Sequence, residues 1–239
     1  MEKAPATYRD IWQRKPVLRA VYGDIYRRML DEIAPGPILE VGGGSGNFKL
    51  FAPAAISSDI LPAPWLDLVC DAQQLPFADA SFGNIVMVDV LHHIPSPLRF
   101  LREAARVLRP GGRVIACEPA ITPLSGPFYR RFHDEPVDMT ANPLADASGP
   151  RNPYDSNQAI PTLLAGRHRT AAARMVPALA LARADYFSFL AYPLSGGFRE
   201  WSLLPSALAA PLLAVEWKLH HLLGRLAGFR LLAVYERKA

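Results

Sequence analysis

The chain has 239 residues, half of them apolar, with 26 basic and 22 acidic side chains and a formal net charge of +4. This composition excludes extensive disorder, and the length suits one domain with a subdomain better than two full domains. The small basic excess is a weak sign of an anionic partner. No block of like charges indicates a nucleic-acid-binding arm, so no nucleic-acid partner is expected.

Neither the chain's start nor its cysteines suggest export. The first 16 residues lack the apolar core of a secretory signal, and no apolar run reaches the roughly 18 residues of a membrane span. Cys70 and Cys117 lie in apolar runs outside any CxxC pair, which favours free thiols. The expected location is therefore a reducing cytoplasm.

Hydrophobic periodicity and turn residues predict elements that alternate along the first half of the chain. A helical segment over 7–33 ends at Ala34-Pro-Gly-Pro37, and a helix over 96–108 ends at Arg109-Pro-Gly-Gly112. A short helix is expected over roughly 46–52, before Pro53, and a long one over 204–227. Strands are expected at 38–41, 54–60, 66–70, 84–90 and 113–119, then at 186–192 and 229–238.

Apolar strands that alternate with helices predict a parallel sheet covered by helices on both faces. The first 119 residues would form half of a doubly wound α/β fold with right-handed crossovers. Residues 120–184 break this alternation and are rich in Pro, Arg, Asp, Asn and Ala. A structureless loop of that length is unusual, so this segment is expected to be a substrate lid or subdomain.

The stretch Ile38-Leu-Glu-Val-Gly-Gly-Gly-Ser-Gly46 joins the first strand to a bend with almost no side chains. A phosphate-binding P-loop would need a Gly-Lys pair, but Lys49 follows Phe48. A dinucleotide fingerprint would need a third glycine where this chain has Asn47. The remaining pattern is an acid, Glu40, followed by glycines at alternate positions.

This pattern resembles motif I of class I S-adenosylmethionine-dependent methyltransferases. The resemblance implies that Glu40 serves the amino end of the methionine moiety; alternatively, Glu40 only accepts hydrogen bonds from the loop. It also implies that Asp59, at the end of the second strand, holds the ribose hydroxyls and that Asp71, after the third, faces the adenine beside the Ala72 backbone. The expected S-adenosylmethionine-binding residues are Glu40, Gly42, Gly43, Gly44, Gly46, Asp59, Ile60, Asp71, Ala72 and Val88.

The similarity continues over roughly 36–120 and is closest to the type-11 methyltransferase domain, where "LHH" follows strand four and "LRPGG" precedes strand five. Gly83 departs from the family's usual aspartate. The family implies a Rossmann-like seven-stranded sheet of order 3-2-1-4-5-7-6 with strand 7 antiparallel. The expected division is a helical cap (1–35), the cofactor-binding core (36–120), a substrate insertion (121–184) and the C-terminal part of the sheet (185–239).

Methyl transfer from a sulfonium needs alignment and exclusion of water, and a hydroxyl acceptor must also lose a proton. His92 and His93 follow strand four, and Glu118 ends strand five, as in some sugar and natural-product O-methyltransferases of this family. The pair is the candidate general base, with Glu118 orienting it. The alternative is that one or both histidines are structural.

Other polar segments carry weaker signals. His133-Asp-Glu135 could complete a substrate pocket, although a solvated turn is the simpler explanation. Its spacing matches no metal motif, so no metal is expected. Asn152-Pro-Tyr-Asp155 resembles an adenine-methylating motif, but that motif would have to follow strand four. Methylation of cytosine C5 would need a Pro-Cys pair, whereas Cys117 is followed by Glu118. Nucleic-acid bases are therefore poor acceptor candidates.

The helix expected over 204–227 carries an apolar seam with 3-4-3-4 spacing. Its members are Leu212, Val215, Leu219, Leu222 and Leu226. The simplest expectation is that the seam packs on the sheet. A homodimer contact or a peripheral membrane contact, helped by Lys218 and Arg225, are the alternatives.

The sequence thus favours an S-adenosylmethionine-dependent methyltransferase that acts on an oxygen of a small-molecule, sugar or lipid-linked hydroxyl compound. An N- or C-methyltransferase, for example on a quinone ring, is the alternative within the enzyme class. A non-catalytic S-adenosylmethionine-binding protein is the alternative outside it.

Overall fold

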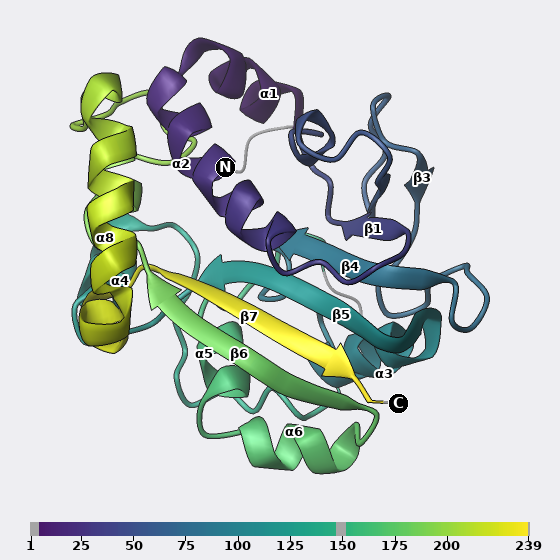
Figure 1. Cartoon of the computed structure of the whole chain (residues 1–239). Coiled ribbons are helices and arrows are strands. Elements are labelled where there is room, and N and C mark those ends of the chain that lie inside the picture. The colour runs from purple at the N-terminus through teal and green to yellow at the C-terminus, as the bar shows by residue number, and fades with distance from the viewer. Residues whose placement is uncertain (1–4, 147–151, 239) are drawn as a thin grey trace.

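A computed structural model describes residues 5–146 and 152–238 (Figure 1). Within these residues seven strands form one sheet in the order β3-β2-β1-β4-β5-β7-β6, in which β7 runs antiparallel to both neighbours. This order is the predicted one. The strands are β1 (Ile38–Val41), β2 (Ile56–Asp59), β3 (Leu68–Val69), β4 (Phe82–Val88), β5 (Leu108–Pro119), β6 (Leu179–Phe187) and β7 (Arg230–Arg237).

Helices cover both faces of the sheet. Figure 1 shows α2 and α8 together on one side and α3, α5 and α6 on the other. The helices are α1 (Pro5–Arg14), α2 (Pro16–Leu30), a single 3₁₀ turn η1 (Phe48–Leu50), α3 (Pro97–Val107), α4 (Ser125–Phe132), α5 (Ile160–Ala165), α6 (Arg169–Met175), α7 (Ala191–Ser195) and α8 (Ser206–Ala227).

Two hydrophobic layers follow from the alternation of side chains along the strands. In β5, Val114 and Ala116 pack in the layer beneath α3 and α6, whereas Ile115 and Cys117 pack in the layer beneath α2 and α8. Because both faces are covered, most residues of the central strands are apolar and buried. A ligand is therefore expected beyond the carboxyl ends of the parallel strands, which the helices do not cover.

The N-terminal helical segment is two helices rather than the one predicted over 7–33. Lys15 takes an extended backbone (φ −114°, ψ 91°), and α2 begins at Pro16. A proline disfavours helical geometry in the residue before it, so the break follows from the sequence. Residues 1–4 of the expected cap and 147–151 of the expected insertion lie outside the described residues.

Three other predicted boundaries were wrong. The predicted helix over 46–52 is only η1. The helix ends before Arg109-Pro-Gly-Gly112 as predicted, but the strand predicted at 113–119 already starts at Leu108, which pairs with Phe82, and its register with β4 is irregular before Arg113. The strand predicted at 186–192 lies at Leu179–Phe187, so the proposed boundary at 184/185 falls inside β6.

The apolar seam of α8 does not pack on the sheet. Val215, Leu219, Leu222 and Leu226 are exposed, and Leu212 is half-buried. The buried face of the helix consists of Ala209, Leu213, Glu216, His220 and Gly224. The helix is therefore rotated so that its most apolar stripe faces outward.

Candidate active site

Three acids stand at the ends of adjacent strands. In the parallel register Glu40 of β1 pairs with Ser57 of β2, and Asp59 pairs with Val69 of β3. Asp71 follows β3 by two residues and is exposed. Ligands of such sheets bind beyond the carboxyl ends of the strands, so these acids share the edge where a ligand is expected.

The glycine bend after β1 needs its glycines for two reasons. Gly42, Gly44 and Gly46 have φ angles of +74°, +44° and +74°, which residues with a side chain rarely adopt. At Gly43 a Cβ would lie 2.2 Å from the Ser57 hydroxyl oxygen and 3.2 Å from a Glu40 carboxylate oxygen. The bare backbone thus lies directly against the acid that ends β1.

Glu40 is 7% exposed and accepts a hydrogen bond from the Ser57 hydroxyl. Burial raises the pKa of Glu40 to about 7, and the nearby Asp59 adds to this shift. A cation that binds beside such a carboxyl group stabilises its ionised form and so lowers its pKa.

Asp59 holds the glycine bend in place. Its two carboxylate oxygens accept hydrogen bonds from the backbone N–H groups of Gly44 (2.9 Å) and Leu61 (3.0 Å). Each oxygen retains a lone pair for a hydroxyl donor. Trp65 lies on the same bend, where its indole N–H donates to the Gly44 carbonyl oxygen over 2.8 Å.

The remaining predicted cofactor residues surround this edge. Ile60 is 49% exposed directly after Asp59, and Ala72 and the strand end Val88 are half-buried. The Asp71 carboxylate accepts hydrogen bonds from the backbone and side chain of Gln73.

The second group of predicted residues forms a buried cluster at the ends of β4 and β5. His92 Nδ1 lies 2.6 Å from Glu118, and its Nε2 lies 3.1 Å from Glu135. Glu118 is fully buried and also accepts hydrogen bonds from the backbone N–H groups of Val90 and Leu91. Burial lowers the pKa of His92, but the hydrogen bonds to both carboxylates outweigh it and raise the pKa to about 10. His92 is therefore held as an imidazolium.

His93 has the opposite environment. Burial and the positive charge of His92 lower its pKa, so the ring is neutral near neutral pH. Its Nε2 lies 3.8 Å from Glu135, and its Nδ1 has no hydrogen-bond partner among the described residues. The two neighbouring histidines therefore differ in charge and in free nitrogens.

The ligand atoms of His92, His93 and Glu135 lie within 4.8 Å of one another, a spacing that a metal ion could bridge. Both ring nitrogens of His92 already face carboxylate oxygens, however. The protonated ring thus completes the hydrogen bonding of the cluster by itself.

Comparison with known proteins identifies the part of the chain that carries the three acids, the glycine bend and the two histidines. Residues 39–116 match the family described as a methyltransferase domain. These residues therefore form a methyltransferase domain similar to those of class I S-adenosylmethionine-dependent methyltransferases. S-adenosylmethionine is its cofactor.

Curated relatives match only short segments of the chain. A 27-O-demethylrifamycin SV methyltransferase of Amycolatopsis mediterranei is 52% identical over 44 residues, 18% of this chain and 16% of that protein. A demethylmenaquinone methyltransferase of Tropheryma whipplei is 46% identical over 59 residues, 24% and 25% of the respective chains. The matched segments thus span a quarter or less of these relatives.

Similar solved structures extend over nearly the whole chain at low identity. An S-adenosylmethionine-dependent methyltransferase of Thermotoga maritima, described as a possible histamine N-methyltransferase, covers 93% of this chain and 92% of its own. The TM-score is 0.55 at 15% identity. This likeness supports the fold alone.

The glycine bend and the three acids fit this cofactor. S-adenosylmethionine carries an ammonium and a sulfonium, and the carboxylates of Glu40 and Asp59 lie against a bend whose Gly43 position a Cβ would fill, while Asp71 follows the next strand. These carboxylates are thus suited to a ligand that carries positive charge and ribose hydroxyl groups.

Glu135 and Gln158 belong to the cluster; the sequence suggested Glu135 only as part of a possible substrate pocket and gave no sign of Gln158. Gln158 is 1% exposed, and its amide donates to Glu135 over 3.2 Å. Both come from the insertion, and the solvated turn suggested for His133-Asp-Glu135 applies only to Asp134, whose side chain is 94% exposed. Neither residue belongs to a recognisable motif, so only their proximity to His92 reveals that they join the cluster.

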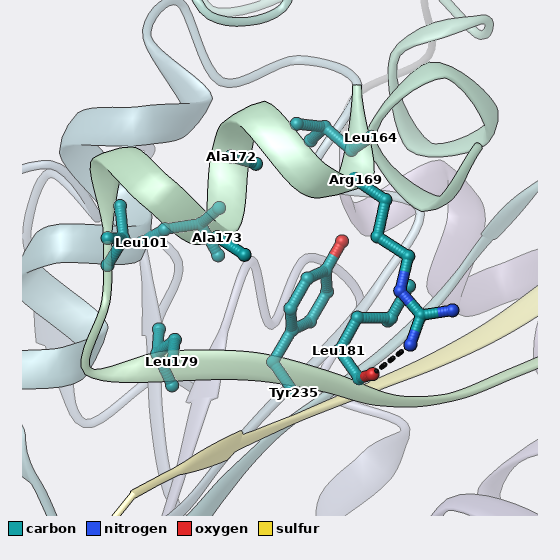
Figure 2. Close-up of a pocket in the computed structure, with 9 residues that line it drawn as sticks. Leu101, Leu164, Arg169, Ala172, Ala173, Leu179, Leu181 and Tyr235 are labelled. Atoms are coloured by element: carbon teal, nitrogen blue, oxygen red, sulfur yellow. Dashed lines mark hydrogen bonds between the residues drawn. The ribbon is translucent and has the colours of Figure 1, made fainter. Parts of the chain in front are cut away.

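Figure 2 shows a cavity between α3, α5, α6 and the sheet, lined by Leu101, Leu164, Arg169 and Tyr235 among others. Its volume is about 10 Å³, enough for about one water molecule. Arg169 donates across it to the Leu181 carbonyl oxygen over 2.8 Å. A cavity of this size on the α6 face holds no methyl acceptor.

Proposed function

We propose that this protein transfers the methyl group of S-adenosylmethionine to an oxygen of a small-molecule, sugar or lipid-linked hydroxyl acceptor. The supporting observation is the cluster of Glu118, His92, Glu135 and His93 at the ends of β4 and β5. These strands lie beside β1, which ends in the glycine bend. The proposal places the cofactor over β1–β3 and the acceptor over β4 and β5.

Each residue has a distinct proposed role. Glu40, Asp59 and Asp71 bind the cofactor around the bend of Gly42, Gly43, Gly44 and Gly46, with Ile60, Ala72 and Val88 beside them. His93, which has a free ring nitrogen, accepts the acceptor's proton. His92 is a positioning residue, because both of its nitrogens face carboxylates. Insertion residues at 121–184 cover the acceptor and exclude water.

The reaction follows from these roles. The acceptor oxygen attacks the methyl carbon in line, an O–CH₃ bond forms, and the S–CH₃ bond breaks with its electron pair moving to sulfur. The acceptor's hydroxyl proton passes to His93, and S-adenosylhomocysteine leaves. Because the methyl group is already activated, the protein contributes mainly alignment and proton transfer.

The test is an acceptor screen that measures S-adenosylhomocysteine released from S-adenosylmethionine. With an active acceptor, His93→Ala should lose most turnover while calorimetry shows unchanged cofactor affinity. His221→Ala, which removes an exposed histidine on α8, is the matched control. The rate should rise with pH through an inflection below the ordinary histidine value of 6.5, because the base must be deprotonated.

Other results would favour other functions. Full turnover by His93→Ala would sink the proposed base and favour an amine or carbon acceptor. The similarity to a demethylmenaquinone methyltransferase makes a quinone ring the first such acceptor to try. Cofactor binding without turnover of any acceptor would instead indicate a non-catalytic S-adenosylmethionine-binding protein.

A further inference from the structure

The outward face of α8 is a continuous apolar stripe. Leu208, Val215, Leu219, Leu222 and Leu226 are between 39% and 79% exposed and follow one another along the helix. A helix of 22 residues is about 33 Å long, so the stripe is far longer than a chance contact between surface leucines. Exposed apolar patches of this extent mark interaction sites.

The stripe continues onto α4 at its C-terminal end. The backbone N–H of Leu124 donates to the Leu226 carbonyl oxygen over 3.1 Å, and Figure 1 places α4 beside the lower part of α8. Leu124 and Phe132, which flank and end α4, are 57% and 58% exposed. The apolar surface therefore runs from α8 to the beginning of the insertion.

The charges beside this surface are positive. Lys218 and Arg225 on α8 and Arg130 and Arg131 on α4 are exposed. The one acid of α8, Glu216, is 4% exposed and accepts hydrogen bonds from the backbone N–H groups at the start of α7. The exposed charge of α8 is therefore cationic throughout.

We propose that α8 and α4 form a surface that binds the headgroup region of an anionic lipid bilayer. An apolar face flanked by Lys and Arg is the pattern of helices that lie in a membrane interface. Anionic lipids attract such cations. A second copy of this chain would instead bring Lys218 and Arg225 towards the same cations of its partner, without acidic residues on α8 to pair with them.

This surface also bears on the acceptor. The segment from Glu118 to α4 connects the buried cluster of the active site to the exposed Leu124 by only a few residues. A lipid-linked acceptor could therefore reach the cluster from the bilayer, a step that rests on the proposed function. The binding of the bilayer itself does not depend on it.

The experiment is vesicle co-sedimentation of the full chain without cofactor or acceptor. We expect binding to mixed phosphatidylglycerol and phosphatidylcholine vesicles, weakening with added salt, and little binding to phosphatidylcholine alone. Leu219→Gln with Leu222→Gln should weaken binding by roughly tenfold or more. Lys218→Gln with Arg225→Gln should weaken it by a similar factor. All four side chains are exposed, so the fold should persist, as thermal unfolding can verify.

Met175→Gln is the matched control, because it removes an exposed apolar side chain from α6 on the opposite face of the sheet. Unchanged binding by this variant supports the proposal. Absence of binding to anionic vesicles, or equal binding by the leucine variant, overturns it. Light scattering tests the alternative of a dimer. A mass of twice 26.3 kDa for the unaltered protein and of 26.3 kDa for the leucine variant, together with no vesicle binding, would assign this face to a second copy and also overturn the proposal.

Discussion

The side chain of Asp59 fixes the glycine bend, and we propose that it also binds the ribose of the cofactor. Asp59→Ala should weaken S-adenosylmethionine binding by more than about tenfold, because it removes charge-assisted hydrogen bonds to the bend and to the hydroxyls. Asp59→Asn should lose less, because one carbonyl oxygen remains. Isothermal titration calorimetry measures both.

Asp79→Ala is the control for this experiment, because Asp79 has a side chain 77% exposed and pairs with Arg106 away from the bend. It should leave cofactor affinity unchanged. Equal affinities of the Asp59→Ala variant and the unaltered protein would contradict the assignment of Asp59.

Glu40 makes cofactor binding depend on pH. Burial raises its pKa to about 7 from an ordinary 4.5, with Asp59 and Asp67 raising it further and the Ser57 hydroxyl and Lys49 opposing them. The phenol of Tyr26 faces it from α2 and stays neutral, because burial raises its pKa. An ammonium beside Glu40 favours the ionised carboxylate, so binding should release a proton below pH 7 and tighten as pH rises towards 7.

Calorimetry in buffers of different ionisation enthalpy counts the released proton, and Glu40→Gln should abolish the release. The same shift affects folding in the free protein. The folded state holds the Glu40 proton more tightly than the unfolded chain, so this group's contribution to the free energy of unfolding falls as pH rises from 4.5 to about 7. A proton count that is unchanged in Glu40→Gln would refute the assignment.

At the scale of elements, the junction between α1 and α2 is tied to a distant loop by one buried ammonium. Lys15 Nζ donates to the carbonyl oxygens of Gly197, Arg199 and Trp201 at 2.7, 2.7 and 2.8 Å. The side chain satisfies three carbonyl groups of the loop that precedes α8. The helix break therefore has a packing consequence as well as a local cause.

Lys15→Met should lower the free energy of unfolding by about 2 kcal/mol, because it leaves these carbonyl groups without their charged donor. Urea denaturation measures the change. Lys218→Met, at an exposed lysine of α8, is the control and should change stability by less than about 0.5 kcal/mol. A loss no larger than in the control would show that the loop does not need the ammonium.

At the scale of the molecule, one ion pair joins its N-terminal helices, its central sheet and its C-terminal strand. Arg230, at the start of β7, is fully buried and lies 2.6 Å from Asp89, which follows β4 with φ of +58°. The Tyr22 hydroxyl of α2 donates to the same carboxylate over 3.1 Å. Arg230 also donates to the Cys117 carbonyl oxygen of β5.

Arg230→Met should lower the free energy of unfolding by about 3 kcal/mol, because it leaves Asp89 without its cation in a largely enclosed site. Arg14→Met is the control, since the side chains of Arg14 and its partner Glu200 are 66% and 68% exposed and such a pair contributes less than about 1 kcal/mol. Chemical denaturation compares the two. Equal losses would mean that the buried pair has no special weight.

The resemblance to the methyltransferase family implied the sheet order, whereas the sequence by itself determined the strands, the glycine bend and the placement of Glu40, Asp59 and Asp71 at successive strand ends. These features depend on local signals: apolar runs set the strands, and a glycine bend next to an acid admits few ligands. The pairing of His92 with Glu118 was also within reach, because parallel strands β4 and β5 are neighbours and end together.

Only the tertiary structure decided which face of α8 is buried, that Glu135 and Gln158 join His92, and that Arg230 reaches Asp89. The physical reason is the same in each case. Periodicity shows that a helix has an apolar side but not which side its neighbours cover, and α8 buries Glu216 and His220 while its leucines face outward. Polar contacts between residues far apart in the chain likewise depend on how the elements pack, which no local pattern records.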